Sequence, residues 1–99
     1  MSDITVADMQ RHAEQLCRDH EIDWRANRTR NAYCFIDLRN IYTPPIRGPV
    51  SYGAVMHEIG HILGRHNGSR HVMTREVWAW RWARANALLW TPETPLVRV

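Results

Sequence analysis

His57, Glu58 and His61 form a His-Glu-x-x-His motif in the middle of an apolar stretch. Residues four apart lie on one face of a helix, so the two imidazoles would be one turn apart and could share a metal ion. Glu58 would be offset from His57 by about 100° and from His61 by about 60° around the helix. Its carboxylate could then reach a water molecule on the metal without being a ligand. The motif therefore predicts a Zn²⁺ site with Glu58 as general base.

The residues around this motif are uncharged. With these neighbours the motif is a more specific signal than its five positions would be alone. They are Ala54, Val55, Met56, Ile59, Gly60, Ile62 and Leu63. A surface helix is rarely so apolar, and burying ionisable side chains is costly unless they are paired or bind a metal. The flanks therefore favour a buried metal site over a surface helix that carries His, Glu and His by chance.

A zinc hydrolase needs three protein ligands and one open position, so a third ligand must be sought beyond the motif. The pattern H-E-x-x-H-x-x-G-x-x-H is matched at Gly64, but Asn67 stands where the pattern requires its third histidine. His66 is one residue out of register, and His71 lies in a predicted loop. These two histidines are alternatives, and neither is the preferred third ligand.

Glu76 is the preferred third ligand. It lies near the start of a second predicted helix, on a face that it shares with Ala79 and Ala83. Small side chains would let this helix approach the motif helix closely, and a carboxylate on such a face is best explained by a nearby cation. Alternatively, Glu76 binds no metal and lies near the helix start because the helix dipole favours a negative charge there. The predicted site therefore combines Glu76 with the two motif histidines.

Hydrophobic patterning and capping residues predict a single α+β domain over residues 1–99. The first predicted helix spans residues 5–19, with Thr5 and Asp8 as a capping box. Short strands are predicted at residues 22–24, 33–38 and 41–43, with a tight turn at 39–40, and they should form a small, twisted, mostly antiparallel sheet. The motif helix is predicted over residues 51–65 and the last helix over residues 75–90, capped by Ser51 and Thr74.

This order of elements resembles the minimal catalytic core of the ImmA/IrrE-type metallopeptidases of phages, mobile elements and bacteria. The specific match is confined to residues 51–63 and to residues 76–83, where Glu76 is followed by Ala79-x-x-x-Ala83. The resemblance implies a minimal zincin-like fold of gluzincin type, in which the helix after the motif carries a glutamate ligand. It also implies a peptide or protein substrate, which in some family members is a repressor-type transcription factor.

Composition and charge narrow the remaining function classes. The net charge is +3, and the 13 basic residues are all arginines scattered along the chain. This distribution is typical of a solvated basic face and does not favour nucleic-acid binding. The N-terminus has no basic start and the chain has no long apolar run, so we expect no membrane contact and a cytoplasmic location. Without a C-x-x-C pair, Cys17 and Cys34 are expected to be free thiols that fill the core.

Three further expectations remain, and the first two concern the chemistry of the site. The donor for a developing oxyanion would be Tyr52, His66, His71 or Arg75, among which the sequence does not choose. A metal-binding histidine usually donates its second ring N–H to an oxygen, and Asp37 could accept it.

The third expectation concerns the five tryptophans, which one small domain cannot easily bury together. The Trp-rich last helix is therefore expected to form part of the core and a contact with a second copy or a protein partner. The leading hypothesis is a zinc metallopeptidase. The alternative is a non-catalytic, zinc-stabilised binding or regulatory module that acts through the Trp-rich helix.

Overall fold

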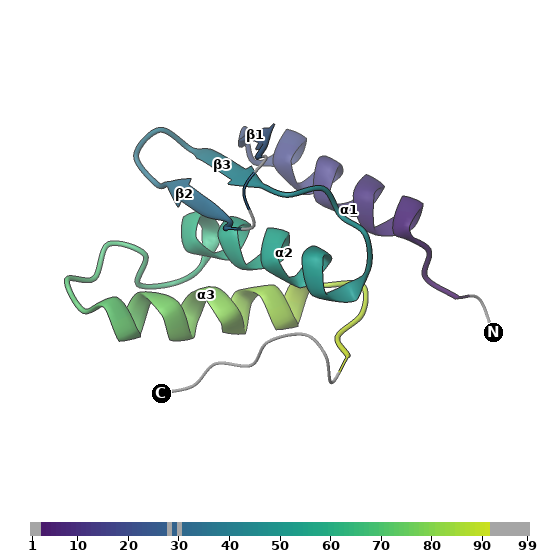
Figure 1. Ribbon diagram of the computed structural model, residues 1–99. Helices are drawn as coiled ribbons and strands as arrows, with labels where there is room; N and C mark the ends of the chain where they lie inside the picture. The colour runs from purple at the N-terminus through teal and green to yellow at the C-terminus, as the bar shows by residue number, and fades with distance from the viewer. Residues whose placement is uncertain (1–2, 28, 30, 92–99) are drawn as a thin grey trace.

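A computed structural model describes residues 3–27, 29 and 31–91 of the chain, and it confirms the α+β fold class. Helix α1 (Val6–Asp19) is followed by strands β1 (Asp23–Ala26), β2 (Tyr33–Phe35) and β3 (Asn40–Thr43), and then by helices α2 (Pro49–Leu63) and α3 (Val72–Asn86). Figure 1 shows α2 between the sheet and α3, with α1 beside the sheet. Helix α2 contacts α1, α3, β2 and β3, so it is the central element of the fold.

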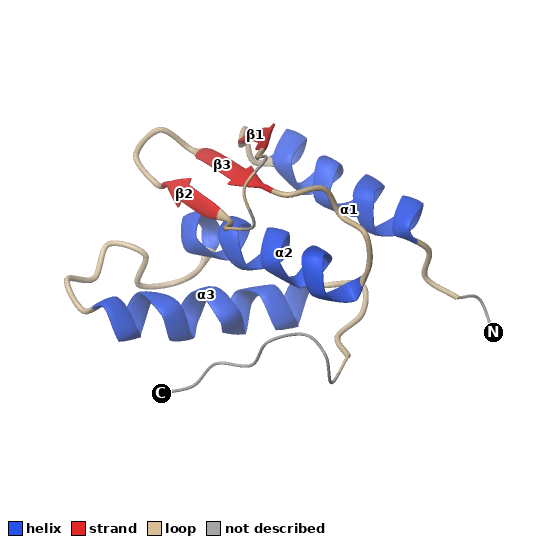
Figure 2. Ribbon diagram, viewed as in Figure 1, coloured by secondary structure: helices blue, strands red, loops and turns tan. Residues whose placement is uncertain are grey.

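The sheet is mixed, so the prediction of a mostly antiparallel sheet is wrong for one of its two pairings. The strand order is β1-β3-β2, with β3 antiparallel to β2 but parallel to β1 (Figure 2). The parallel pairing is supported by a hydrogen bond in which the Trp24 indole N–H donates to the Thr43 hydroxyl at 2.8 Å. Strand β2 ends at Phe35, three residues earlier than predicted, and residues 36–39 form the turn.

Local sequence explains the starts of α1 and α2. Thr5 and Asp8 form the predicted capping box at the start of α1. Helix α2 begins at Pro49, before the predicted cap Ser51, whose hydroxyl accepts hydrogen bonds from the backbone N–H groups of Arg47 and Gly48. A backbone N–H in the first turn of a helix has no acceptor within the helix. Proline, which lacks this N–H, therefore loses no hydrogen bond there.

Helix α3 begins earlier than predicted and also ends earlier. It spans Val72–Asn86 rather than residues 75–90, so Thr74 lies inside its first turn and His71 occupies the N-cap position without a side-chain cap. Without a strong capping residue, the start of this helix is set by packing against α2. No helix in the described part of the chain is long and apolar enough to span a membrane.

Helices α2 and α3 approach one another closely at Gly60. A Cβ atom added at Gly60 would overlap the carbonyl oxygen of Ala79, and one at Gly64 would lie 3.1 Å from the carbonyl oxygen of Trp78. Ala79 and Ala83 are almost fully buried at this contact, as the predicted small-residue face requires. The close approach places the first turns of α3 beside the His-Glu-x-x-His motif.

We expect Gly60→Ala to destabilise the protein by about 1–3 kcal/mol, because the added methyl group would force the two helix backbones apart. Helix propensity alone predicts the opposite sign, since alanine in a helix interior is favoured over glycine by about 0.5–1 kcal/mol. Denaturant unfolding measures the difference, with Gly68→Ala as the control because a Cβ there meets nothing within 4 Å. Equal or higher stability of Gly60→Ala would contradict the close approach.

Candidate metal centre

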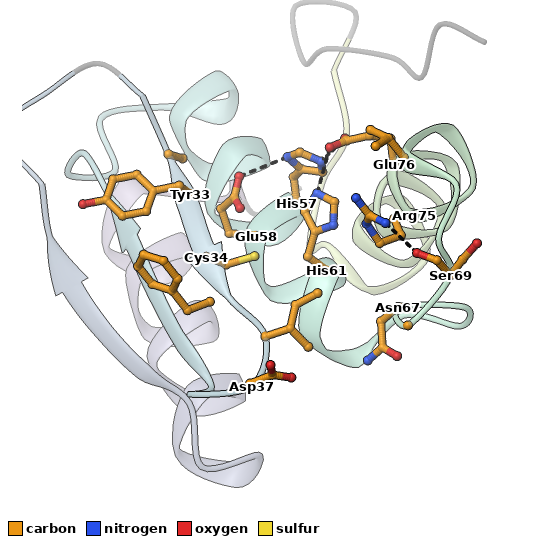
Figure 3. A pocket seen from close by; sticks show the side chains of 15 residues that line it. Tyr33, Cys34, Asp37, His57, Glu58, His61, Asn67, Ser69, Arg75 and Glu76 are labelled. Carbon is orange, nitrogen blue, oxygen red and sulfur yellow. Dashed lines mark hydrogen bonds and ion pairs between the residues drawn. The ribbon is translucent and has the colours of Figure 1, made fainter.

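The side chains of His57, His61 and Glu76 converge where α2 meets α3 (Figure 3). Glu76 Oε2 lies 2.8 Å from His57 Nε2, and Glu76 Oε1 lies 3.1 Å from His61 Nε2. One donor atom from each residue lies within 4.8 Å of the other two. Tetrahedral zinc with bonds of about 2.0–2.1 Å places its ligand atoms roughly 3.3–3.4 Å apart, so small side-chain shifts would fit this group to such an ion.

The burial of these three side chains and the types of donor atom that they offer also suit a metal ion. The side chains of His57 and His61 are only 14% and 11% exposed, whereas that of Glu76 is 36% exposed. Two imidazole nitrogens and one carboxylate are a donor set typical of zinc and other divalent transition metals. The predicted trio is thus brought together as a group that could hold a metal ion.

Glu58 lies beside this group without joining it. Its carboxylate is nearly buried, and Oε2 is 3.3 Å from His57 Nδ1. A proton on Nδ1 would face Glu58 and leave Nε2 free to bind a metal. Glu58 therefore fills the role predicted for Asp37, which lies away from both imidazoles in Figure 3. The expectation for Asp37 was wrong because β2 is short and Asp37 falls in the turn that follows it.

Charges around the two imidazoles shift their pKa values in opposite directions. Burial lowers the pKa of His57, but the hydrogen bond and charge of Glu58, together with the charge of Glu76, outweigh it and raise the pKa above its usual value. Burial and the neighbouring imidazole of His57 lower the pKa of His61. The two rings are thus electrostatically distinct although their centroids are 4.5 Å apart.

Helix α3 holds the His57 ring with a second side chain. The Trp80 indole stacks on the His57 ring at a centroid distance of 4.0 Å and an interplanar angle of 7°. Trp80 follows Glu76 by one helical turn, so both lie on the α3 face toward α2. The alanines on this face predicted that it packs against the motif helix. The sequence did not predict that Trp80 stacks on the ring of His57.

An open pocket of about 800 Å³ leads to the group. Strand β2 and the turn after it line one side, and the loop before α3 and its first turns line the other. Cys34 points into this pocket beside Glu58 (Figure 3), which the sequence did not predict. Burial, followed by the charge and hydrogen bonding of Glu58, raises the Cys34 pKa to about 12, so its thiol is protonated at neutral pH.

The two cysteines are unpaired, as predicted, but only Cys17 is fully buried. It lies on the buried face of α1, and burial raises its pKa to about 11. Cys34 is half-buried: it packs against the core, as predicted, and it also lines the pocket, which the sequence did not predict. Strand alternation could have revealed this, because Cys34 faces the opposite side of the sheet from its exposed neighbours Tyr33 and Phe35.

The alternative third ligands lie outside the group. Asn67 donates a side-chain hydrogen bond to the Ile62 carbonyl at 2.7 Å and so satisfies an otherwise unpaired carbonyl at the end of α2. His66 packs against Trp78 with a ring-centroid distance of 5.0 Å. His71 is exposed at the N-cap position of α3. Glu76, and neither of these histidines, thus belongs to the group that could hold a metal ion.

Of the four predicted oxyanion donors, only Arg75 lines the pocket. The Tyr52 hydroxyl accepts a hydrogen bond from the Leu88 N–H at 2.9 Å and lies 2.7 Å from His12 Nδ1. Tyr52 therefore links α2 to α1 and to the segment after α3. His12 is half-buried at this contact.

Most of the tryptophans pack against the core, which confirms part of the prediction. Trp24, Trp80, Trp82 and Trp90 pack against the core. Trp78 lies outside it, with the guanidinium groups of Arg65 and Arg81 at 5.7 and 4.9 Å from its ring centroid. Contact between Trp78 and a protein partner stays a prediction.

No protein family, no curated protein and no solved structure was found to match the chain. The resemblance to ImmA/IrrE-type metallopeptidases therefore stays an expectation from the two matched segments, and the site geometry is the basis for assigning a function.

Tyr52→Phe is expected to destabilise the fold by about 1–3 kcal/mol, because it leaves the Leu88 N–H and His12 Nδ1 without their shared partner. Metal affinity should not change, since the hydroxyl does not reach the metal-binding group. Thermal unfolding and a metal titration of the same sample measure the two effects. A loss of metal affinity with unchanged stability would instead place Tyr52 at the site.

The stability of the fold should depend on the protonation of His12. Burial lowers the pKa of His12 below its usual value of 6.5, so the unfolded chain binds the proton first as the pH falls. The stability that depends on neutral His12 is therefore present above about pH 6.5 and is lost as the pH falls through the lower folded-state value. The loss of stability between pH 7.5 and pH 5 should be smaller in His12→Asn, which cannot take up this proton, than in the native sequence. An equal loss in both proteins would exclude His12 as a group that titrates in this way.

Proposed function

We propose that the chain is a zinc-dependent metallopeptidase that hydrolyses a peptide bond with a metal-activated water and Glu58 as general base. The observation that carries this proposal is the convergence of His57, His61 and Glu76 at an open pocket, with Glu58 buried beside them. Zinc in such a donor set lowers the pKa of water and polarises a carbonyl group.

The residues of the chain would divide the reaction between them. His57 and His61 would present Nε2 to the ion, and Glu76 would present a carboxylate oxygen. Glu58 would take a proton from the attacking water and deliver it to the leaving nitrogen as the carbon–nitrogen bond breaks. Trp80 would hold the His57 ring in place by stacking.

Strand β2 supports a peptide as the substrate. It lies at one edge of the sheet and lines the pocket through Tyr33, Cys34 and Phe35. An edge strand can pair with an extended peptide backbone. We infer a gluzincin-type enzyme related to the ImmA/IrrE group of phages and bacteria, acting in the cytoplasm.

A second candidate function follows from the contact of Glu58 with His57. If Glu58 serves only to orient the imidazole, the metal would stabilise a non-catalytic binding module, and the half-buried Trp78 would be available to a partner. Glu58→Gln separates the two functions, because it should retain the metal and the fold in both, but should abolish the biological effect of the chain only if that effect depends on catalysis.

Metal analysis and a peptide-cleavage assay test the proposal together. Protein purified without added metal should contain close to one zinc per chain and should cleave members of a mixed peptide library. Zinc far below this ratio would reject the metal site. Full zinc loading without cleavage of any peptide, or of proteins from a bacterial lysate, would favour the binding module.

A further inference from the structure

A single basic side chain lines the pocket beside the metal-binding group. Among the described lining residues, Arg75 is the only arginine, and it immediately precedes Glu76 on α3. The other formally charged side chains are the carboxylates of Asp37, Glu58 and Glu76. A divalent ion would offset the charges of Glu58 and Glu76. The pocket would then have a cationic wall at Arg75 and an anionic end at Asp37, which Figure 3 shows apart from one another.

The guanidinium of Arg75 is anchored but keeps donors for a ligand. Its Nη1 donates a hydrogen bond to the Ser69 carbonyl oxygen at 2.5 Å, and no carboxylate of the described residues pairs with it. A guanidinium has five N–H donors, so most of them remain. In Figure 3 the group lies beside His61, on the α3 side of the pocket. A fixed, unpaired cation at this position is suited to bind an anionic group of a ligand.

We propose that Arg75 is a specificity-determining residue that binds a carboxylate of the peptide substrate. The carboxylate comes from the C-terminus of the peptide or from an Asp or Glu side chain near the scissile bond. Arginine matches the planar carboxylate with two parallel hydrogen bonds, which a lysine cannot reproduce. The first turn of α3 adds partial positive charge nearby, because no side chain caps it. The choice of a peptide ligand rests on the proposed function.

Peptide binding to zinc-loaded Glu58→Gln protein tests this proposal without turnover. Three probes carry a carboxylate at one of two places or not at all: acetylated tetra-alanine with a free C-terminus, the amide with one Ala replaced by Glu, and the neutral tetra-alanine amide. Calorimetry should give about tenfold tighter binding for at least one carboxylate peptide than for the neutral amide, as expected for a charge-assisted pair. Which carboxylate peptide gains affinity identifies the source of the carboxylate.

Variants then assign the preference to Arg75. In the same background, Arg75→Gln should bind all three peptides alike, and Arg75→Lys should keep only part of the preference. Arg84→Gln is the matched control, because Arg84 lies on the last turn of α3 and is exposed. It should keep the full preference, and circular dichroism confirms that each variant is folded.

Two outcomes would overturn the proposal. One is the absence of any preference for carboxylate peptides in the parent protein. The other is a preference that persists in Arg75→Gln, which would place the carboxylate on the metal. Neither outcome depends on cleavage. If the chain binds carboxylates through Arg75 but hydrolyses no peptide, the proposed enzymatic function is refuted and the proposed carboxylate site is supported.

Discussion

Glu58→Gln is expected to lower the rate of peptide cleavage by about 10²- to 10⁴-fold, the usual contribution of a general base. The amide cannot take a proton from water at neutral pH, and it has nearly the volume of the carboxylate. The fold should therefore persist, because the amide oxygen can still accept from His57 Nδ1. Metal content should stay close to that of the native sequence, since Glu58 does not belong to the metal-binding group.

Initial rates and metal content measured on the same samples check this expectation. Glu21→Gln is the matched control, because Glu21 is exposed after the end of α1 and changes the net charge equally. It should leave the cleavage rate unchanged. Full activity of Glu58→Gln would remove Glu58 from the reaction, and loss of metal in this variant would contradict the position of Glu58 outside the metal-binding group.

Removing the metal should lower the melting temperature by about 15–30 °C. An ion present at about 1,000 times its dissociation constant stabilises the folded state by about 4 kcal/mol. In a domain of this size each kcal/mol corresponds to about 4–8 °C. We expect the metal-free chain to remain folded at low temperature, because the Glu76 carboxylate lies against both imidazoles and compensates part of the lost interaction.

Thermal unfolding with excess zinc and after chelation measures this effect. Glu76→Ala should remove most of the zinc-dependent shift, whereas His66→Ala and His71→Ala should keep it. This comparison tests the choice of third ligand directly. A zinc-dependent shift that survives Glu76→Ala but disappears in His71→Ala would reverse the assignment and require the loop before α3 to rearrange.

Predictions from the sequence were most accurate where the information is local. The His57–His61 spacing and the capping box at Thr5 depend on residues within one helical turn, and both appear as predicted. Glu76 was correctly placed because small residues on one helix face indicate a close helix contact. The fold class followed from the same local patterns.

Predictions failed where distant segments decide the outcome. The parallel pairing of β1 with β3 depends on how the chain returns to the sheet, which strand patterning does not encode. The direction of Tyr52 is set by His12 and Leu88, 40 and 36 residues away along the chain. Arg75 was one of four candidates for the oxyanion donor, and the sequence could not choose among them because the pocket lining depends on how α3 and the loop before it pack against α2 and β2.

The contact between Gly60 and Ala79 has a consequence for the metal-binding group. Gly60 lies one residue before His61, and Ala79 lies one turn after Glu76, so backbone atoms in contact fix the separation of the helices that supply the three donors. The helices cannot move closer, and they can separate only by losing buried contacts. An ion would therefore be accommodated by rotation of the three side chains, whose donor atoms lie within 4.8 Å of one another. The absence of a side chain at Gly60 thus brings donors from two helices within reach of one ion.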